Sequence, residues 1–96
     1  MLALTDSAAE AVRALVSSSE ETAETGGLRV AAEHEGDMVS LEFNVVVLPG
    51  EDDEVIEAEG ARVFLEPTAA SLLDDKVLDA SIEADRIAFL LTDQED

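Results

Sequence analysis

An alternation of apolar and polar residues in the middle of the chain constrains the fold most. Every second residue from 39 to 47 is apolar, and the positions between the first four are polar: Val39, Leu41, Phe43, Val45 and Val47 enclose Ser40, Glu42 and Asn44. Side chains two residues apart lie on the same face of a strand. The pattern therefore predicts a strand with one apolar face, which must be covered by the rest of the chain.

The segment from Met38 to Pro67 as a whole predicts a β-meander with acidic turns. Pro49-Gly50 end the first strand, and Glu51-Asp52-Asp53 are predicted to form a solvated turn. A second strand begins at Val55-Ile56, and after a turn over residues 58–60 a third strand follows over residues 62–65. The flanking segments should pack on this meander.

The N-terminal segment predicts an amphipathic helix that covers the meander. Its start signal lies at Thr5, Asp6 or Ser7, and Ser7 with Glu10 has the spacing of a capping box. Apolar residues follow at helical spacing and form one stripe: Ala8, Val12, Leu15 and Val16. We expect this stripe to cover the sheet and not to bind a partner, with Phe43 and Phe64 packed beneath Val12 and Leu15.

The remaining segments complete one domain over residues 1–96, with its core over about residues 2–91. Residues 17–27 form a polar exit from the helix, which extends at most to Glu24. A strand over 28–32 and a loop over 33–37 lead to the long central strand. Pro67 begins a short second helix, and residues 81–87 form a hairpin whose last strand covers 87–91. The charged tail, residues 92–96, is predicted to be disordered.

The charge of the chain excludes two classes of partner. Twenty-four Asp and Glu residues face five Lys and Arg residues, which gives a formal charge of −19. Such a field repels nucleic acid and anionic membrane surfaces. The acids are either a surface for a basic partner or a compositional adaptation, for example to a salt-rich cytoplasm. No stretch approaches the roughly 20 apolar residues of a membrane span, and no leader opens the chain. We expect a cytoplasmic protein.

The sequence offers little catalytic chemistry. The chain has no cysteine, which excludes disulfides, thiolate ligands and thiol catalysis. It has no nucleophile elbow and no phosphate-binding loop, so we expect neither an enzyme nor a bound cofactor. His34, the single histidine, lies among Glu33, Glu35 and Asp37. These four residues are either a metal site or a solvated loop, and the second interpretation is preferred because neighbours in an extended loop point to opposite sides. The acids of residues 51–54 lack the EF-hand pattern.

The order of several short motifs resembles a known family. These motifs are Leu4-Thr5 with Ala8-Ala9, Gly27-Leu28-Arg29-Val30, Leu41-Glu42-Phe43, Asp53-Glu54-Val55, Gly60, Val63-Phe64-Leu65, Pro67, Leu72-Leu73-Asp74 and Leu78-Asp79. Over roughly residues 2–91 the chain is similar to the A-type iron–sulfur carriers of the HesB/IscA type. The resemblance implies an α+β, mainly β fold: a compact domain of two small sheets with an N-terminal amphipathic helix and a short second helix.

The function of that family rests on three cysteines that hold iron or a cluster, and none of them is present here. The resemblance places the first in the loop that is here Glu33–Asp37 and the other two near the carboxyl end, where this chain has Asp93–Asp96. Carboxylates replace thiolates poorly as cluster ligands. We therefore predict a protein-interaction module of iron–sulfur metabolism, monomeric or homodimeric, that binds another protein and does not carry a cluster. The alternative is a weak iron or divalent-metal binder that uses His34 and the neighbouring carboxylates.

Overall fold

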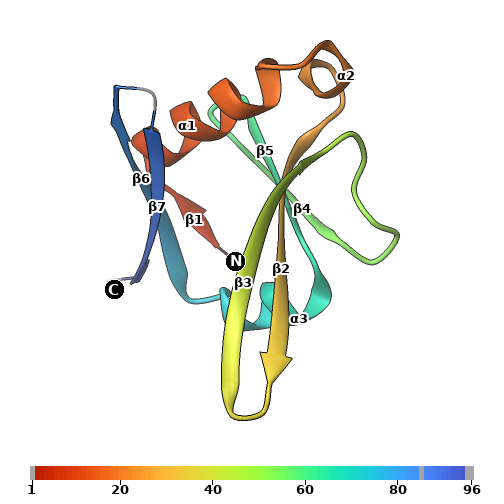
Figure 1. Cartoon of the computed structure of the whole chain (residues 1–96), viewed down its shortest axis with the longest axis vertical. Coiled ribbons are helices and arrows are strands. Elements are labelled where there is room, and N and C mark those ends of the chain that lie inside the picture. Colours follow the sequence, from red (N-terminus) through yellow and green to blue (C-terminus); the bar gives the residue numbers. More distant parts are fainter. Residues whose placement is uncertain (1, 85, 95–96) are drawn as a thin grey trace.

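The computed structural model describes residues 2–84 and 86–94, and these form two small sheets with three short helices (Figure 1). The elements in chain order are β1 (Ala3–Leu4), α1 (Asp6–Ser17), α2 (Glu20–Ala23), β2 (Gly27–Glu35), β3 (Met38–Val46), β4 (Glu54–Ala58), β5 (Ala61–Leu65), α3 (Pro67–Leu72), β6 (Lys76–Glu83) and β7 (Arg86–Asp93). The predicted fold, mainly β with two small sheets, an N-terminal helix and a short second helix, is confirmed.

The larger sheet has the strand order β3-β2-β5-β4, which differs from the predicted meander. Strands β4 and β5 do form the predicted hairpin, but β3 pairs with β2 and lies at the opposite edge from β4. Strand β2 occupies the centre and runs parallel to β5, with Leu28 beside Val63 and Val30 beside Leu65. The centre suits β2 because Leu28 and Val30 are fully buried. The segment between β3 and β4 carries the chain across the sheet.

The smaller sheet joins segments from both ends of the described chain. Its order is β1-β6-β7, in which β1 is parallel to β6 and β6 forms an antiparallel hairpin with β7. This hairpin agrees with the one predicted over residues 81–87. Strand β7 continues to Asp93, and the backbone amide of Gln94 donates to the Asp75 carbonyl at 2.9 Å. The prediction of a disordered tail is therefore wrong for residues 92–94, whereas residues 95–96 lie outside the described part.

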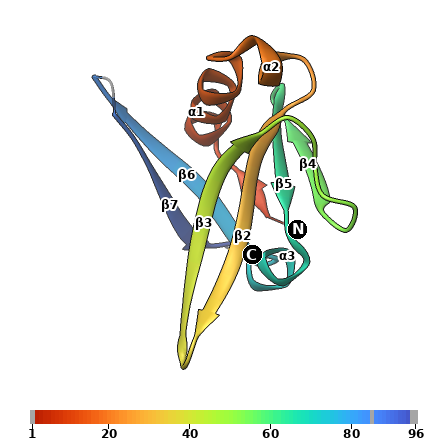
Figure 2. The same ribbon diagram turned by 45° about the vertical axis from the view of Figure 1, so that its right-hand side comes forward.

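Helix α1 lies across one end of both sheets and contacts β6 of the smaller sheet and β5 and β2 of the larger one (Figures 1 and 2). Its buried side chains are small, which allows the sheets to approach the helix closely: Ala8, Ala9, Ala11, Val12 and Val16. Leu15 is only half-buried. Of the three predicted start positions, Thr5 is the N-cap, because its hydroxyl accepts from the Ala8 amide at 3.1 Å. Ser7 lies inside the helix, so the predicted capping box of Ser7 and Glu10 is wrong.

The core lies between the two sheets, and one predicted core residue lies outside it. Val63 and Leu65 face α1 and the core, whereas Phe64, between them on β5, is buried on the opposite face of the sheet. The prediction that Phe64 packs beneath Val12 is therefore wrong. Phe43 does face the core side, but it is half-buried and stacks on Phe89 of β7 with ring centroids 5.4 Å apart.

The hairpin of β2 and β3 extends well beyond the core (Figure 2). The two strands pair without interruption to Glu35 and Met38, and Gly36 with Asp37 forms a two-residue turn. Gly36 has φ +60°, the left-handed conformation that glycine adopts without strain at the first position of such a turn. The segment predicted as a loop over residues 33–37 is therefore mostly strand. Polar residues are tolerated there because this part of the strand is solvated on both faces.

Candidate functional site

The residues proposed as metal ligands lie at the exposed end of the β2–β3 hairpin. Glu33, His34 and Glu35 are consecutive strand residues, so His34 points to the face opposite its two neighbours. Asp37 lies in the turn, and all four side chains are exposed. Over residues 2–84 and 86–94, no three His, Cys, Asp or Glu side chains lie close enough together to hold a metal ion. The hairpin geometry thus separates the four candidates instead of bringing them together.

An ion pair that the sequence did not reveal fixes the connection between β3 and β4. Arg29 of β2 donates to both carboxylate oxygens of Asp53, at 2.7 and 3.1 Å, and the Gly50 amide donates to the same carboxylate at 2.7 Å. The Asp53 side chain is only 2% exposed. The hydrogen bond from Arg29 lowers the pKa of Asp53. Asp53 is thus a structural anchor, and its prediction as part of a solvated turn is wrong.

Two further carboxylates are used by helix starts. Asp79 of β6 accepts from the Thr5 hydroxyl at 2.7 Å, and this hydrogen bond, with one from the Ala80 amide, lowers the pKa of Asp79. Glu66 is the N-cap of α3 and accepts from the Ala69 amide at 3.1 Å. Backbone amides, that of Thr68 first, lower the pKa of Glu66. The hydrogen bonds at these two helix starts account for the lowered pKa values of both carboxylates, whose role is structural.

A concavity of about 270 Å³ lies beside the end of α1 and is lined by Arg13 and Arg62. Both guanidinium groups are engaged by the backbone: Arg13 donates to the Glu59 carbonyl, and Arg62 donates to the carbonyls of Gly26 at 2.7 Å and Ala23 at 3.3 Å. Arg62 thereby supplies donors to carbonyls at the end of α2. The carboxyl end of α1, which also borders this concavity, carries partial negative charge. These two arginines are accounted for by the fold.

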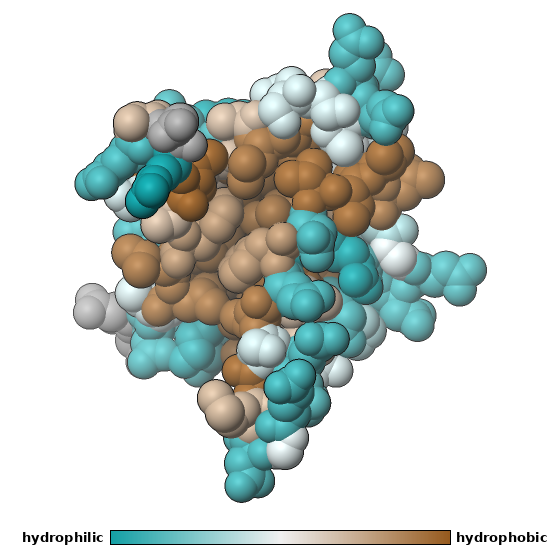
Figure 3. Space-filling view, viewed as in Figure 1, coloured by the Kyte–Doolittle hydropathy of each residue, from teal (hydrophilic) through white to brown (hydrophobic). Residues whose placement is uncertain are grey.

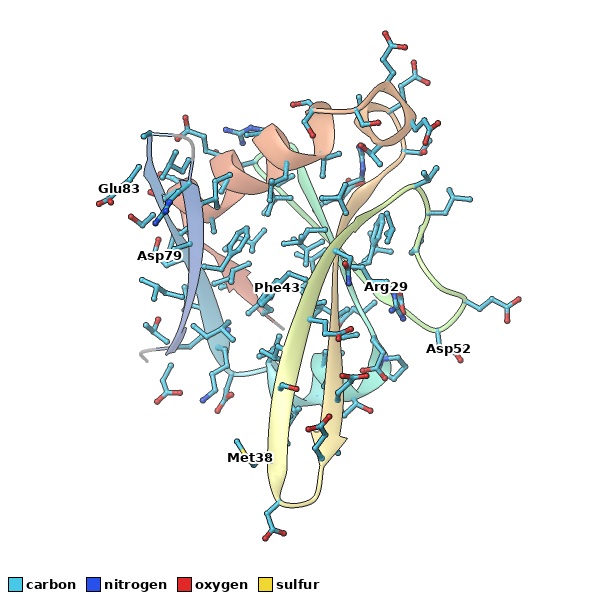
Figure 4. All side chains as sticks on the ribbon, viewed as in Figure 1. Arg29, Met38, Phe43, Asp52, Asp79 and Glu83 are labelled. Atoms are coloured by element: carbon cyan, nitrogen blue, oxygen red, sulfur yellow. The ribbon has the colours of Figure 1, made fainter. Side chains whose placement is uncertain are left out.

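An apolar surface spans the junction of the two sheets, and we call it the inter-sheet patch. Its members are half-buried or exposed and come from the core-facing sides of two edge strands, β3 and β7: Val39, Leu41, Phe43, Val45, Ile87, Phe89 and Leu91. Figure 3 shows it as a broad brown area bordered by teal side chains, and Figure 4 shows Phe43 near its centre. Val39 is 45% and Val45 is 38% exposed. The face that the alternation assigned to the core is thus only partly covered.

The sequence identified the β3 members of the inter-sheet patch but neither their exposure nor the members on β7. Alternation gives β3 an apolar face, whereas residues 87–91 of β7 are all apolar. Neither pattern shows that the strand lies at a sheet edge. The available signal is the number of apolar faces: the sheets present more apolar surface than one 12-residue helix covers. Contiguous exposed apolar surface of this kind marks sites of interaction with other molecules.

Comparison with known proteins gives consistent matches over nearly the whole chain. The sequence model of the family "Iron-sulphur cluster biosynthesis" matches residues 1–94. An uncharacterized protein of Bradyrhizobium diazoefficiens is 36% identical over 80 residues, which cover 82% of this chain and 74% of that protein.

Solved structures of two iron–sulfur proteins have the same fold. The structure of Escherichia coli SufA, described as involved in biosynthesis of iron–sulfur clusters, superposes with a TM-score of 0.76 at 26% identity, covering 96% of this chain and 84% of SufA. The structure of IscA with the [2Fe-2S] cluster gives a TM-score of 0.68 at 20% identity, covering 97% of this chain and 82% of IscA.

The residues of this chain do not fit an iron–sulfur cluster. Cluster irons are held by thiolates, with histidine as an occasional substitute. The chain has no cysteine and a single histidine, which is exposed at the end of a hairpin. The two-residue turn at Gly36 and Asp37 presents one carboxylate where the resemblance placed a cysteine.

The longest helix among residues 2–84 and 86–94 is α1 with 12 residues, and none of the helices there could span a membrane.

Proposed function

Because the chain belongs to the iron–sulphur cluster biosynthesis family and contains no cysteine, we propose that it is a protein-binding domain of iron–sulfur metabolism that does not carry the cluster. Its fold is that of an A-type, HesB/IscA-like domain. The observation that carries the proposal is the combination of this fold with a sequence that has no thiolate ligand. A fold retained without its ligands still presents the surfaces through which proteins of the family can be recognised.

The inter-sheet patch supports a role in binding and not in catalysis. Its lining is apolar, and it brings together no nucleophile with a general base over the described residues. The concavity beside α1 contains one hydroxyl, that of Ser17, which donates to the Arg13 carbonyl at 2.6 Å. The apolar side chains of the inter-sheet patch bury surface area on contact with a partner but have no group that can transfer a proton or act as a nucleophile.

One experiment with two arms tests this function. In the first arm, the tagged protein is used for capture from its native cytoplasm, and the bound fraction is probed for cluster-assembly proteins. We expect at least one to be enriched over a tag-only control. Enrichment of unrelated proteins alone would contradict the assignment to iron–sulfur metabolism.

The second arm tests the alternative, a weak iron or divalent-metal site at His34 with Glu33, Glu35 and Asp37. Ferrous iron is titrated calorimetrically, without oxygen, into the wild-type protein and into His34→Ala. We expect no saturable heat for either protein, because the four side chains do not converge. Saturable binding that is lost in His34→Ala would favour the metal binder over the protein-binding domain.

A further inference from the structure

We propose that the inter-sheet patch binds an extended segment of another protein, in which basic and apolar residues alternate and which adds to the free edge of β3. This inference rests on the proposed function and specifies the binding site and the chemistry of the partner. The strand order places β3 at the edge of its sheet, and in the described part of the chain no strand lies beside the outer side of its backbone. An edge strand presents unpaired N–H and C=O groups, which an added strand can satisfy.

The spacing of the patch on β3 fits an extended segment. Its apolar residues lie at every second position from Val39 to Val45, so neighbouring members are separated by about 6.8 Å along the strand. An added strand would present its own alternate side chains at the same spacing. Those facing the sheet junction would lie over Phe43 and Phe89, whose rings stack across β3 and β7. Apolar side chains are therefore expected at these positions of the partner.

The opposite face of β3 indicates which side chains the partner would carry at the positions between its apolar residues. Ser40, Glu42 and Asn44 point away from the patch, and Glu33 of β2 lies directly opposite Ser40 on this face. Over residues 2–84 and 86–94, neither glutamate has an ion-pair partner. Side chains directly across two strands interact, and opposite charges there are favourable. Lysine or arginine at the alternate positions of the partner would lie beside Glu42 of β3. Glu33 lies one strand further away, about 9.6 Å from the added strand, so only a long basic side chain would reach it.

The overall charge disfavours a second copy as the occupant. Each copy has a formal charge of −19, so two copies would bring like charges together around the patch. Several of the few cations are used within the molecule: Arg29 binds Asp53, Arg13 and Arg62 bind backbone carbonyls, and Lys76 contacts Asp75 and Asp93. In a segment that alternates basic and apolar residues, the apolar side chains would pack on the patch and the basic ones would be attracted by the surrounding carboxylates.

The test uses a fluorescently labelled peptide that alternates lysine with valine, and a peptide of the same composition in which all lysines precede all valines. Anisotropy is measured against the full chain and against two double variants of unchanged charge. Val39→Ser with Val45→Ser alters the patch. Val55→Ser with Leu90→Ser is the matched control, because Val55 is 46% and Leu90 is 55% exposed and both lie outside the patch. Circular dichroism verifies that both variants are folded.

We expect the alternating peptide to bind, and the patch variant to weaken this binding about tenfold, which corresponds to a loss of about 1.4 kcal/mol. The control variant should bind within about twofold of the wild type. Amide NMR shifts caused by the peptide should be concentrated at Met38–Val46.

Four results would overturn the inference. Equal binding of the two peptides, or equal weakening by the two double variants, would show general attraction to an acidic surface. Absence of binding would exclude this partner class. Dimerisation of the wild type in sedimentation experiments, abolished by the patch variant, would assign the patch to a second copy. If the capture experiment described above still enriches a cluster-assembly protein, any of these results would refute this binding mode and leave the proposed function standing. Failure of the binding mode is thus distinguishable from failure of the proposed function.

Discussion

At the scale of single residues, the most informative side chain is Asp53, which the acidic composition conceals. The sequence predicts a run of solvated acids at residues 51–54, and nothing in the run distinguishes Asp53 from Asp52. The difference arises from Arg29, 24 positions away, which local sequence reasoning does not place beside it. Phe64 was misplaced for a related reason. Residues 63–65 are all apolar, so periodicity does not indicate which of them faces the helix.

Replacing Asp53 by Asn should destabilise the protein at neutral pH by about 1–3 kcal/mol, with the lower part of the range favoured because Arg29 is 33% exposed. The pKa of Asp53 is lowered in the folded state. Its contribution to stability is therefore present above the unfolded pKa and is lost as the pH falls through the lower folded value. Urea unfolding from pH 7 to pH 3 should show the difference between wild type and Asp53→Asn shrinking with acidification.

Arg86→Met is the control for this experiment, since Arg86 is an exposed cation at the start of β7. It should change the unfolding free energy by less than about 0.5 kcal/mol. A pH-independent difference between wild type and Asp53→Asn would show that the carboxylate charge is not what holds the connection between β3 and β4.

At the scale of elements, most of the strands and the helix α1 could be predicted, whereas the strand order could not. Alternation in β3 and β6 and helical spacing in α1 are local properties. The insertion of β2 between β3 and β5 depends on which strand is apolar enough for the centre of the sheet. The sequence favours a meander, because strands that are neighbours in sequence commonly pair. The same limitation hid the candidate site, since the inter-sheet patch exists only because β3 and β7 are edges.

The start of α1 gives a test at this scale. Thr5→Val keeps the shape of the side chain but removes the hydroxyl that caps the helix, and it should cost about 0.5–2 kcal/mol. Ser7→Ala should be neutral or slightly stabilising, because Ser7 is exposed within the helix and alanine is the better helix former. Urea denaturation of both variants decides the question. A larger loss for Ser7→Ala would restore the capping box of Ser7 and Glu10.

At the scale of the whole molecule, charge repulsion should oppose folding. With a formal charge of −19, the compact state is penalised, and salt screens this repulsion over a Debye length of about 8–10 Å at physiological strength. We expect the melting temperature to rise with sodium chloride, with most of the gain reached by a few tenths molar. A gain of about 1 kcal/mol would appear as a rise of about 4–8 °C for a domain of this size.

Divalent ions provide the control for the salt experiment. Calcium, magnesium and ferrous iron at matched ionic strength should have effects close to that of sodium. Strong stabilisation by traces of one of them would indicate specific binding, by mass action. No response to sodium chloride would show that the acids are too dispersed for their repulsion to affect stability.

The parallel pairing of β1 with β6 has a consequence for how the chain folds. The larger sheet is complete once Leu65 has been synthesised, but Thr5 contacts Asp79 across 74 positions of sequence. Helix α1 therefore remains uncovered on one side until β6 emerges from the ribosome. Contacts of such sequence separation slow folding, because a long loop must close before they form. The nascent chain would expose the side of α1 that faces β6 during this interval, and transiently exposed apolar surface of this kind promotes aggregation.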